Sequence, residues 1–336
     1  MILAGFTRMA GPTRKIRWGV LGYARAAREL VGPALLRAAN AEFYALASRD
    51  EGKLAECRSR FPGVRTHRSY DELLRDPEVE AVYIPLPNAL HREWTIRAAE
   101  QGKHVLCEKP ISLNAAECRE MASACAAHGV ILMEAFMYRY TDRIQKVCEI
   151  LRSGALGNIK FVEASYSFLL ANPASIKLKP ELGGGALYDI GCYLLNFAGM
   201  VADEAIGGAA ESRPDSVAAS AVRSGGIDEA FSALLRYPSG LVAALTCGIR
   251  AHKRMEATIV GTEGVLEVPE PFSDAGGSLA LIRGDERREI PVAACDRYRL
   301  EAEDFSAAIL ENRRPRLGLA ESLRNMEVID RLFAAS

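Results

Sequence analysis

Short apolar runs alternate with segments of helical periodicity over the first 140 residues, and this alternation constrains the fold more than any other feature. The apolar runs lie at 16–22, 42–48, 79–84, 105–108 and 130–134. Helical spacing fills the intervals, most clearly at 29–39 and 115–128. Strands and helices in this order predict a parallel sheet with helices on both faces. Such a sheet binds ligands beyond the carboxyl ends of its strands.

The pattern changes after Arg139. Polar and apolar residues alternate along four further segments, as expected of half-buried strands, at 159–168, 230–237, 241–249 and 256–261. Pro238-Ser239-Gly240 predicts a hairpin turn between the second and third of these. Two helices, at 299–312 and 319–334, end the chain. We therefore predict an α/β Rossmann domain over 14–139, then an α+β domain over 140–336. The second domain would hold a large open, mainly antiparallel sheet, and its C-terminal helices could pack back on the first.

Composition excludes several classes of function. The 336 residues carry a formal net charge of -1, which argues against binding a nucleic-acid backbone. No apolar run approaches the roughly 20 residues that span a bilayer, and the charge order in residues 1–13 is not that of a signal peptide, so we expect an unstructured leader. The eight cysteines form neither a Cys-x-x-Cys pair nor a zinc pattern. We expect buried thiols, no metal and a cytoplasmic protein.

The turn after the first strand, Gly22-Tyr23-Ala24-Arg25-Ala26-Ala27, stands where dinucleotide-binding folds carry G-x-G-x-x-G. The helix start that follows would offer free N–H groups to a pyrophosphate. Alanine at the third glycine position is a known variant, but Ala24 points a methyl group toward the phosphate. Alone, the motif is also compatible with an ordinary α/β turn. The predicted cofactor contacts here are Gly22, Tyr23, Ala24, Arg25 and Ala27.

The residues at the end of the second strand indicate whether the cofactor is NAD(H) or NADP(H). This strand end reads Ser48-Arg49 and lacks the acidic residue that binds a ribose 2′-hydroxyl. Arg49 could pair with a 2′-phosphate through two hydrogen bonds, with the Ser48 hydroxyl as a further donor. This favours NADP(H) over NAD(H). The alternative is that Arg49 is a solvated turn residue.

Glu108-Lys109-Pro110 follows a buried strand at the edge where ligands bind. Lys109 could donate a hydrogen bond to a substrate oxygen and stabilise negative charge there. Partial burial would lower its pKa toward the range of a proton relay. Glu108 could pair with the lysine or hold the nicotinamide ribose.

Five segments in order resemble the glucose-fructose oxidoreductase / inositol dehydrogenase / rhizopine-catabolism (Gfo/Idh/MocA) family. They are the first turn, Ile84-Pro85-Leu86-Pro87-Asn88-Ala89-Leu90-His91, Gly102 to Pro110, Glu134 to Arg139, and Gly183-Gly184-Gly185-Ala186-Leu187-Tyr188-Asp189-Ile190-Gly191-Cys192-Tyr193. The resemblance covers the chain from about Lys15 onward. It implies the same two-domain fold and hydride transfer between NAD(P) and sugars, inositols or related diols.

The resemblance also implies roles for particular residues. Lys109 would contact the reacting oxygen. Tyr193, where the family often has histidine, would be the general acid/base, with a pKa lowered from ~10 by Lys109. Asp189, one helical turn earlier, would orient the substrate and help to position Tyr193. The remaining cofactor contacts would be Pro85, Leu86, Asn88, His91, Glu108 and Arg139.

Other interpretations stay open at several positions. His91 could simply start a helix, and Arg139 could form a salt-bridged hinge. Lys177 and Lys179 could reach a sugar, although a solvated loop is the preferred interpretation. Tyr298 could enter the active site.

Three functions compete with a sugar or polyol oxidoreductase that releases its cofactor. The first is an aldose–aldose oxidoreductase that retains NADP(H). The second is a dihydrodiol dehydrogenase, which belongs with NADP-dependent xylose dehydrogenases and ketosugar reductases to the tyrosine-containing branch that the chain resembles. The third is an NADP-sensing binding protein without catalysis. An open sheet with an apolar face further predicts a homodimer or a dimer of dimers.

Overall fold

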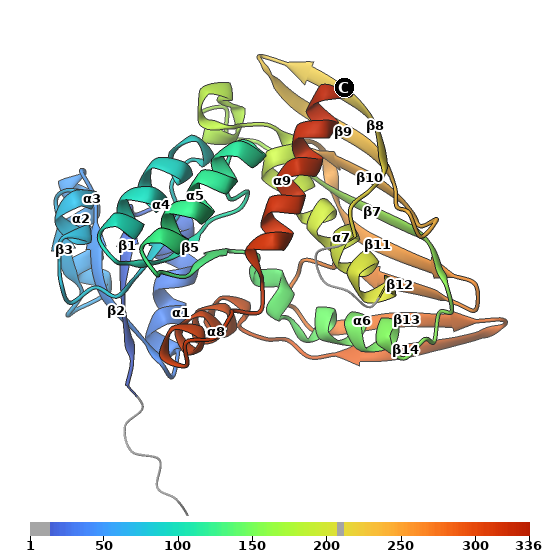
Figure 1. Cartoon of the computed structure of the whole chain (residues 1–336), viewed down its shortest axis with the longest axis horizontal. Coiled ribbons are helices and arrows are strands. Elements are labelled where there is room, and N and C mark those ends of the chain that lie inside the picture. Colours follow the sequence, from blue (N-terminus) through green and yellow to red (C-terminus); the bar gives the residue numbers. More distant parts are fainter. Residues whose placement is uncertain (1–13, 207–211) are drawn as a thin grey trace, which may run out of the picture.

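The computed structural model describes residues 14–206 and 212–336. The expectation for residues 1–13 lies outside the described residues. The first part of the chain forms a six-stranded parallel sheet in the order β3-β2-β1-β4-β5-β6 (Figure 1). Its strands are β1 (Ile16–Leu21), β2 (Ala41–Ala47), β3 (Arg65–His67), β4 (Ala81–Ile84), β5 (His104–Cys107) and β6 (Leu132–Glu134). This confirms the predicted Rossmann arrangement.

The helices between these strands begin where the sequence offers caps. Side chains of Asp50, Ser69 and Asn114 each accept a hydrogen bond from the backbone N–H three residues later. The helices are α2 (Glu51–Arg60), α3 (Tyr70–Leu74), α4 (His91–Glu100) and α5 (Ala115–Ala127). The first helix joins a π segment, η1 (Ala27–Val31), to α1 (Gly32–Arg37). Pro33, near the start of α1, has no N–H to donate, which accounts for the widened turn.

The second sheet has eight strands in the order β14-β13-β12-β11-β7-β10-β9-β8. They are β7 (Ile159–Leu169), β8 (Ser216–Ser224), β9 (Ile227–Arg236), β10 (Val242–Gly248), β11 (Arg250–Gly261), β12 (Val265–Pro269), β13 (Gly277–Arg283) and β14 (Glu286–Val292). All neighbours are antiparallel except β7 and β10, which are parallel. The predicted hairpin is confirmed as β9–β10. Sequence periodicity missed β8 and β12 to β14.

Helices cover only one face of this sheet (Figure 1). They include α6 (Asp142–Arg152) and α7 (Cys192–Ile206), and α7 follows directly on a π segment, η6 (Leu187–Gly191). The C-terminal helix α9 (Leu319–Ala334) packs against β8 on the same side. The opposite face exposes the large apolar side chains Phe161, Leu169, Val222 and Leu234. The stretch Pro180–Ala205 is long and apolar enough to cross a membrane, but 89% of its most apolar window is buried inside the protein. We interpret it as a core helix.

The chain returns to the Rossmann domain through α8 (Arg297–Leu310). The ring of Phe305 lies 5.4 Å from that of Trp18 on β1, and both side chains are fully buried. Trp18 Nε1 donates a hydrogen bond to Ser306 Oγ at 3.0 Å. Helix α8 therefore packs against the first sheet.

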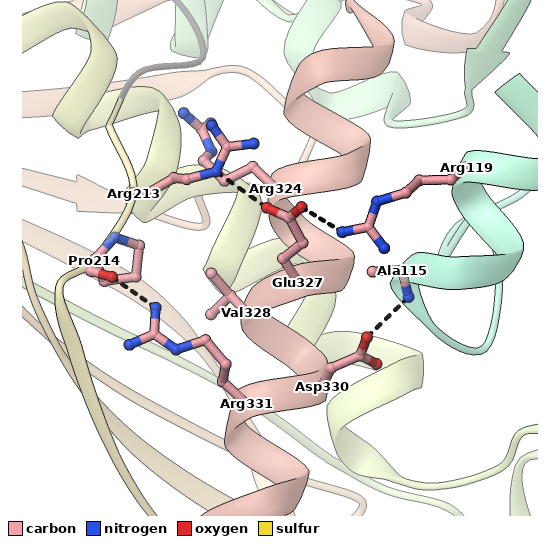
Figure 2. A pocket seen from close by; sticks show the side chains of 9 residues that line it. All are labelled: Ala115, Arg119, Arg213, Pro214, Arg324, Glu327, Val328, Asp330 and Arg331. Carbon is pink, nitrogen blue, oxygen red and sulfur yellow. Dashed lines mark hydrogen bonds and ion pairs between the residues drawn. The ribbon is translucent and has the colours of Figure 1, made fainter. Parts of the chain in front are cut away.

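Helix α9 (Leu319–Ala334) ties the two domains together (Figure 2). Glu327 accepts hydrogen bonds from Arg119 on α5 at 2.7 Å and from Arg213 at 3.0 Å. Asp330 accepts one from the backbone N–H of Ala115 at 2.9 Å. The groove between these elements contains none of the predicted site residues. The contacts of Glu327 and Asp330 hold α9 against α5.

We expect Phe305→Ala to destabilise the protein by about 3–5 kcal/mol, because it leaves a cavity against Trp18 between α8 and the first sheet. Denaturant unfolding measures the loss. Leu36→Ala is the matched control, since Leu36 is 58% exposed on α1 and should change stability by less than about 0.5 kcal/mol. Equal effects of the two variants would contradict this packing.

Candidate active site

The turn between β1 and the first helix has the geometry of a phosphate cradle. Gly22 has φ +100°, a conformation that L side chains rarely adopt, and a Cβ there would lie 3.2 Å from Leu86 and 3.3 Å from the Tyr70 hydroxyl. Helical backbone begins at Arg25, whose side chain is largely exposed. Ala24 is half-buried at the turn. The helix start thus presents backbone N–H groups where a diphosphate would bind.

Tyr23 contributes to this turn through its backbone. Its side chain is only 5% exposed, and its hydroxyl is buried without a hydrogen-bond partner. Burial raises its pKa. Ala27 is fully buried, which allows the helix to pack closely on the sheet. Of the predicted contacts in the turn, the side chain of Arg25 is the one that reaches solvent.

At the end of β2, Arg49 is exposed and makes no ion pair within the described part of the chain. Asp50, the next residue, caps α2 by accepting a hydrogen bond from the backbone N–H of Lys53. Ser48 is buried, and its hydroxyl accepts from the backbone N–H of Asp50 at 3.2 Å. An uncompensated guanidinium and a hydroxyl therefore stand where the adenosine ribose of a dinucleotide would lie. This donor set fits a phosphate on that ribose.

His91, the first residue of α4, follows the loop after β4 and is fully buried. Its Nδ1 lies 2.9 Å from the carbonyl oxygen of Pro110, and its Nε2 lies 2.8 Å from that of Leu86. Burial lowers its pKa to about 4, so the ring is neutral and donates to one carbonyl at a time. Because it lies between these two carbonyl oxygens and donates to one of them, His91 links the loop after β4 to the Glu108-Lys109-Pro110 turn. This geometry gives it a positioning role.

Other residues of the loop after β4 serve the cofactor edge and the domain junction. Pro85 and Leu86 are buried, with Leu86 beside Gly22. Asn88, in the short helix η2 (Asn88–Leu90), donates to the carbonyl oxygen of Gly183 in the second domain at 2.8 Å. A Cβ on Gly183 would lie 2.9 Å from that of Asn88. The first glycine of the triplet is thus required by the close approach of the two domains.

Lys109 crosses from the end of β5 to the second domain. Its Nζ donates to the backbone oxygen of Asp189 at 2.6 Å and lies 3.6 Å from Asp189 Oδ1. It also lies 4.7 Å from the ring centroid of Tyr193. Burial acts to lower its pKa, but nearby acidic groups, the carboxylates of Asp189 and Glu108 among them, outweigh burial and hold the pKa well above its ordinary value. The expected lowered pKa is therefore wrong, because the neighbouring acidic groups were not visible in the sequence.

The Glu108 carboxylate lies next to Lys109 and bonds to its backbone N–H. It is a half-buried carboxyl that accepts hydrogen bonds from the Tyr83 hydroxyl at 2.5 Å and from the backbone N–H of Lys109 at 3.2 Å. Burial raises its pKa, although Lys109 acts in the opposite direction. Tyr298, on the first turn of α8, is also buried, and its pKa is raised to about 12 mainly by burial. The charges of Glu108 and Lys109 act on it, so it borders the site.

Tyr193 lies at the start of α7 and is only 6% exposed. Its ring packs against Phe136, Tyr138, Tyr166 and Phe272 at centroid distances of 5.3–6.1 Å. Burial raises its pKa well above 10, and the opposing charge of Lys109 does not compensate. The expectation of a lowered pKa is wrong, since desolvation inside the aromatic cluster dominates. Tyr193 is thus a neutral phenol, able to donate a proton.

Asp189 occupies the π segment η6. It contacts Lys109 and accepts a hydrogen bond from Lys177 Nζ at 2.7 Å, with its side chain 12% exposed. No hydrogen bond joins it to Tyr193 within the described residues, because the π turn alters the spacing of a regular helix. The side chains of Asp189 and Tyr193 instead each contact the Lys109 ammonium group. The expected direct positioning of Tyr193 by Asp189 is therefore replaced by an indirect one.

Arg139 lies in the short helix η3 (Met137–Tyr140) and pairs with Glu321 of α9 at 2.7 Å, with both side chains nearly buried. Its guanidinium also donates to Asn196 at 3.2 Å. These contacts match the salt-bridged hinge rather than a cofactor contact. Sequence reasoning missed Glu321 and Asn196, which lie far from any motif.

We expect His91 to make stability depend on pH. Its folded pKa lies below the unfolded value of about 6.5, so the unfolded chain binds the extra proton and stability falls as pH drops toward about 4. Between pH 7 and pH 5 the loss should be about 2 kcal/mol relative to His91→Gln. Glu134, with a pKa raised by burial to about 7, acts in the opposite direction.

Denaturant unfolding of both proteins at the two pH values isolates the His91 contribution, because Glu134 titrates in each. Parallel pH dependences of the wild type and His91→Gln would contradict the assignment.

Within residues 14–206 and 212–336, no group of three or more His, Cys, Asp or Glu side chains is placed to hold a metal ion. All eight cysteines are free thiols. The residues that the structure brings together are therefore the phosphate cradle and, beyond the end of β5, Lys109, Tyr193 and Asp189.

Both parts of the chain match family models. Residues 16–136 match the family model "Oxidoreductase family, NAD-binding Rossmann fold", and residues 144–267 match "GFO/IDH/MocA C-terminal domain". The chain is 33% identical to D-xylose 1-dehydrogenase (NADP(+)) 2 of Haloferax volcanii, over 95% of this chain and 97% of that protein.

Two solved structures have nearly the same fold. KijD10, a 3-ketoreductase from Actinomadura kijaniata in complex with NADP and TDP-benzene, has a TM-score of 0.88 at 29% identity, covering 96% of this chain and 98% of that one. Aldose-aldose oxidoreductase from Caulobacter crescentus has a TM-score of 0.87 at 27% identity, covering 96% and 97%. Variants of KijD10 that match as well replace a lysine and, 84 residues later, a tyrosine. The chain belongs to the GFO/IDH/MocA family of oxidoreductases.

Proposed function

We propose that the protein is an NADP(H)-dependent oxidoreductase that transfers a hydride between nicotinamide and a CH–OH or C=O carbon of a sugar or related polyol. The observation that carries this proposal is the meeting of Lys109, Tyr193 and Asp189 at the same sheet edge as the Gly22 turn. A nucleotide-binding fold alone would require none of the three.

The residues suited to hold the cofactor form a continuous edge. The Gly22 turn and the helix start at Arg25 would bind the diphosphate, and Ser48 with Arg49 would bind a 2′-phosphate. Leu86, which lies beside the Gly22 turn, and Glu108 would line the path of the cofactor toward Lys109. When bound, the nicotinamide would supply the hydride as NADPH or accept it as NADP+. The protein's own residues would orient the substrate and would donate a proton to its oxygen or accept one from it.

Lys109 and Tyr193 suit the protonation step. The Lys109 ammonium, turned from the oxygen of Asp189, can donate to a substrate oxygen and stabilise its developing negative charge. The Tyr193 phenol can deliver the proton to that oxygen, because its raised pKa keeps it protonated. The site is thus prepared for carbonyl reduction at neutral pH. Alcohol oxidation requires prior loss of the phenol proton.

The variants of KijD10 give independent support. The substituted lysine and tyrosine of that 3-ketoreductase are separated by 84 residues, as are Lys109 and Tyr193. The equal spacing in a similar fold supports our choice of Lys109 and Tyr193 as the central pair of the proposed site.

The decisive experiment follows cofactor fluorescence with NADPH and NADH across aldoses, ketosugars, inososes and an aromatic dihydrodiol. Turnover of a sugar that requires added NADP(H) supports the proposal. Cofactor retained through purification, with ping-pong kinetics, would indicate an aldose–aldose oxidoreductase. Turnover of the dihydrodiol alone would indicate a dihydrodiol dehydrogenase. Tight NADPH binding without any turnover would indicate a sensor.

Tyr193→Phe should lower kcat/KM for reduction by about 10²–10⁴-fold, because the proton donor is lost. In the wild type, the rate of alcohol oxidation should rise about tenfold per pH unit from pH 7 to 9, since the small ionised fraction of Tyr193 rises with pH. Steady-state pH profiles measure both. A wild-type plateau below pH 8, or an unchanged profile in Tyr193→Phe, would exclude Tyr193 as the acid/base.

Arg49→Ala should weaken NADPH binding about 10–100-fold, because a charge-assisted pair with the 2′-phosphate is lost. NADH is the internal control, since it lacks that phosphate and its affinity should change little. Fluorescence titration with both cofactors measures the shift. Equal weakening of both would place Arg49 outside the 2′-phosphate site.

Assembly follows from the open sheet. We infer a homodimer, or a dimer of dimers, packed through the uncovered face, because Phe161 and Leu234 are each about half exposed there and Leu169 and Val222 more so. The eight free thiols are compatible with the reducing cytoplasm. A neutral sugar is the expected partner of the site, with no role for nucleic acid or membrane.

A further inference from the structure

Six side chains around the site form a closed ring of contacts, each touching the next. In order they are Lys109, Asp189, Lys177, Phe168, Tyr166 and Tyr193. Three of them carry charge on one side of the ring, and three are aromatic on the other. Lys177 was the unexpected member, because a solvated loop is the ordinary interpretation of its position in the sequence.

The loop that carries Lys177 is fixed by the glycine triplet. Lys177 lies in the short helix η4 (Ile176–Leu178), and its carbonyl oxygen accepts the N–H of Gly185 at 3.0 Å. A Cβ on Gly184 would lie 2.6 Å from that same oxygen, so only glycine permits the approach. Lys179, two residues later, is exposed and makes no ion pair within the described residues. The solvated-loop interpretation therefore holds for Lys179 and fails for Lys177.

The carboxylate of Asp189 lies between two ammonium groups. Its Oδ2 is 2.7 Å from Lys177 Nζ, and its Oδ1 is 3.6 Å from Lys109 Nζ. The Lys177 side chain is 40% exposed, whereas those of Lys109 and Asp189 are 13% and 12% exposed. Lys177 therefore keeps a face open to a ligand. A donor and an acceptor held side by side, next to the lysine that serves the reacting oxygen, suit the neighbouring hydroxyl of a diol.

The aromatic side of the ring offers a surface for a sugar ring. Tyr166 and Phe168 are two residues apart on β7 and so point to the same face of the sheet, with centroids 6.5 Å apart. Tyr166 stacks on Phe272 at 5.6 Å with an interplanar angle of 22°, and Lys177 Nζ lies 5.0 Å from the Phe168 centroid. Both rings of β7 are only half-buried. The C–H face of a pyranose can pack on such rings while its hydroxyls meet the charged side.

We propose that Lys177 is a specificity-determining residue that, with Asp189, binds the hydroxyl adjacent to the reacting carbon of a sugar whose ring packs on Tyr166 and Phe168. The inference rests on the proposed function, since it takes Lys109 to mark the reacting oxygen. It names the substrate class as a sugar with vicinal hydroxyls. An isolated surface ion pair would contribute little to stability and would not distinguish one sugar from another.

The test compares D-glucose with 2-deoxy-D-glucose, which lacks the hydroxyl adjacent to both C1 and C3. Calorimetry measures the binding of each sugar to the protein saturated with NADP+, for the wild type, Lys177→Met and the control Lys179→Met. The wild type should bind D-glucose about 10–100-fold more tightly than the deoxy sugar, because a charge-assisted hydrogen bond is lost with the hydroxyl. Lys177→Met should remove this preference, and Lys179→Met should retain it.

Kinetics on the same pairs provide a second readout, with KM rising in Lys177→Met and kcat changing by less than about threefold. Equal weakening of both sugars by Lys177→Met, or no preference in the wild type, would overturn the proposal. Selective binding without hydride transfer would instead leave the Lys177 assignment standing and refute the proposed function. NADPH affinity serves as the check that the variant is folded, since Lys177 lies outside the cofactor cradle.

Discussion

The contact between Lys109 and Asp189 is the interaction on which the site depends. It joins the end of β5 in the first domain to the π segment before α7 in the second, with Lys109 Nζ 2.6 Å from the Asp189 oxygen. His91 holds the Lys109-Pro110 turn from one side. From the other, the close approach of Gly183 to Asn88 fixes the second domain. Helices α8 and α9 maintain this arrangement over a longer distance, because they return to pack on the first domain and on α5.

Burial and charge act on the two central groups in different proportions. For Lys109, neighbouring acidic groups outweigh desolvation, so the amine stays charged. For Tyr193, desolvation by the aromatic cluster outweighs the attraction of Lys109, so the phenol stays neutral. A cation and a neutral proton donor together stabilise a reacting carbonyl oxygen as it gains negative charge and then a proton. The same arrangement explains why alcohol oxidation should need higher pH.

Much of the fold could be predicted from sequence, because alternating periodicity and turn residues are local signals. Both sheets were anticipated, as were the β9–β10 hairpin and the return of α8. Strands such as β8 were missed, since most of its residues are exposed and its pairing depends on a distant partner. The site was predicted where motifs carry it. A salt-bridged hinge at Arg139 was one open interpretation, but its partner Glu321 and the contacts of Lys177 could not be predicted, because they depend on residues that folding brings together. The predicted lowering of the Lys109 and Tyr193 pKa values was wrong for the same reason.

The most direct test of the central claim follows the hydride itself. The protein is incubated with NADPH that carries deuterium on the transferable position of nicotinamide C4 and with a panel of aldoses and ketosugars, and the products are examined by mass spectrometry and NMR. Hydride transfer at the Lys109–Tyr193 site predicts one deuterium on the former carbonyl carbon of a sugar product. Deuterium that stays in the cofactor across the panel, despite saturating NADPH, would contradict the account.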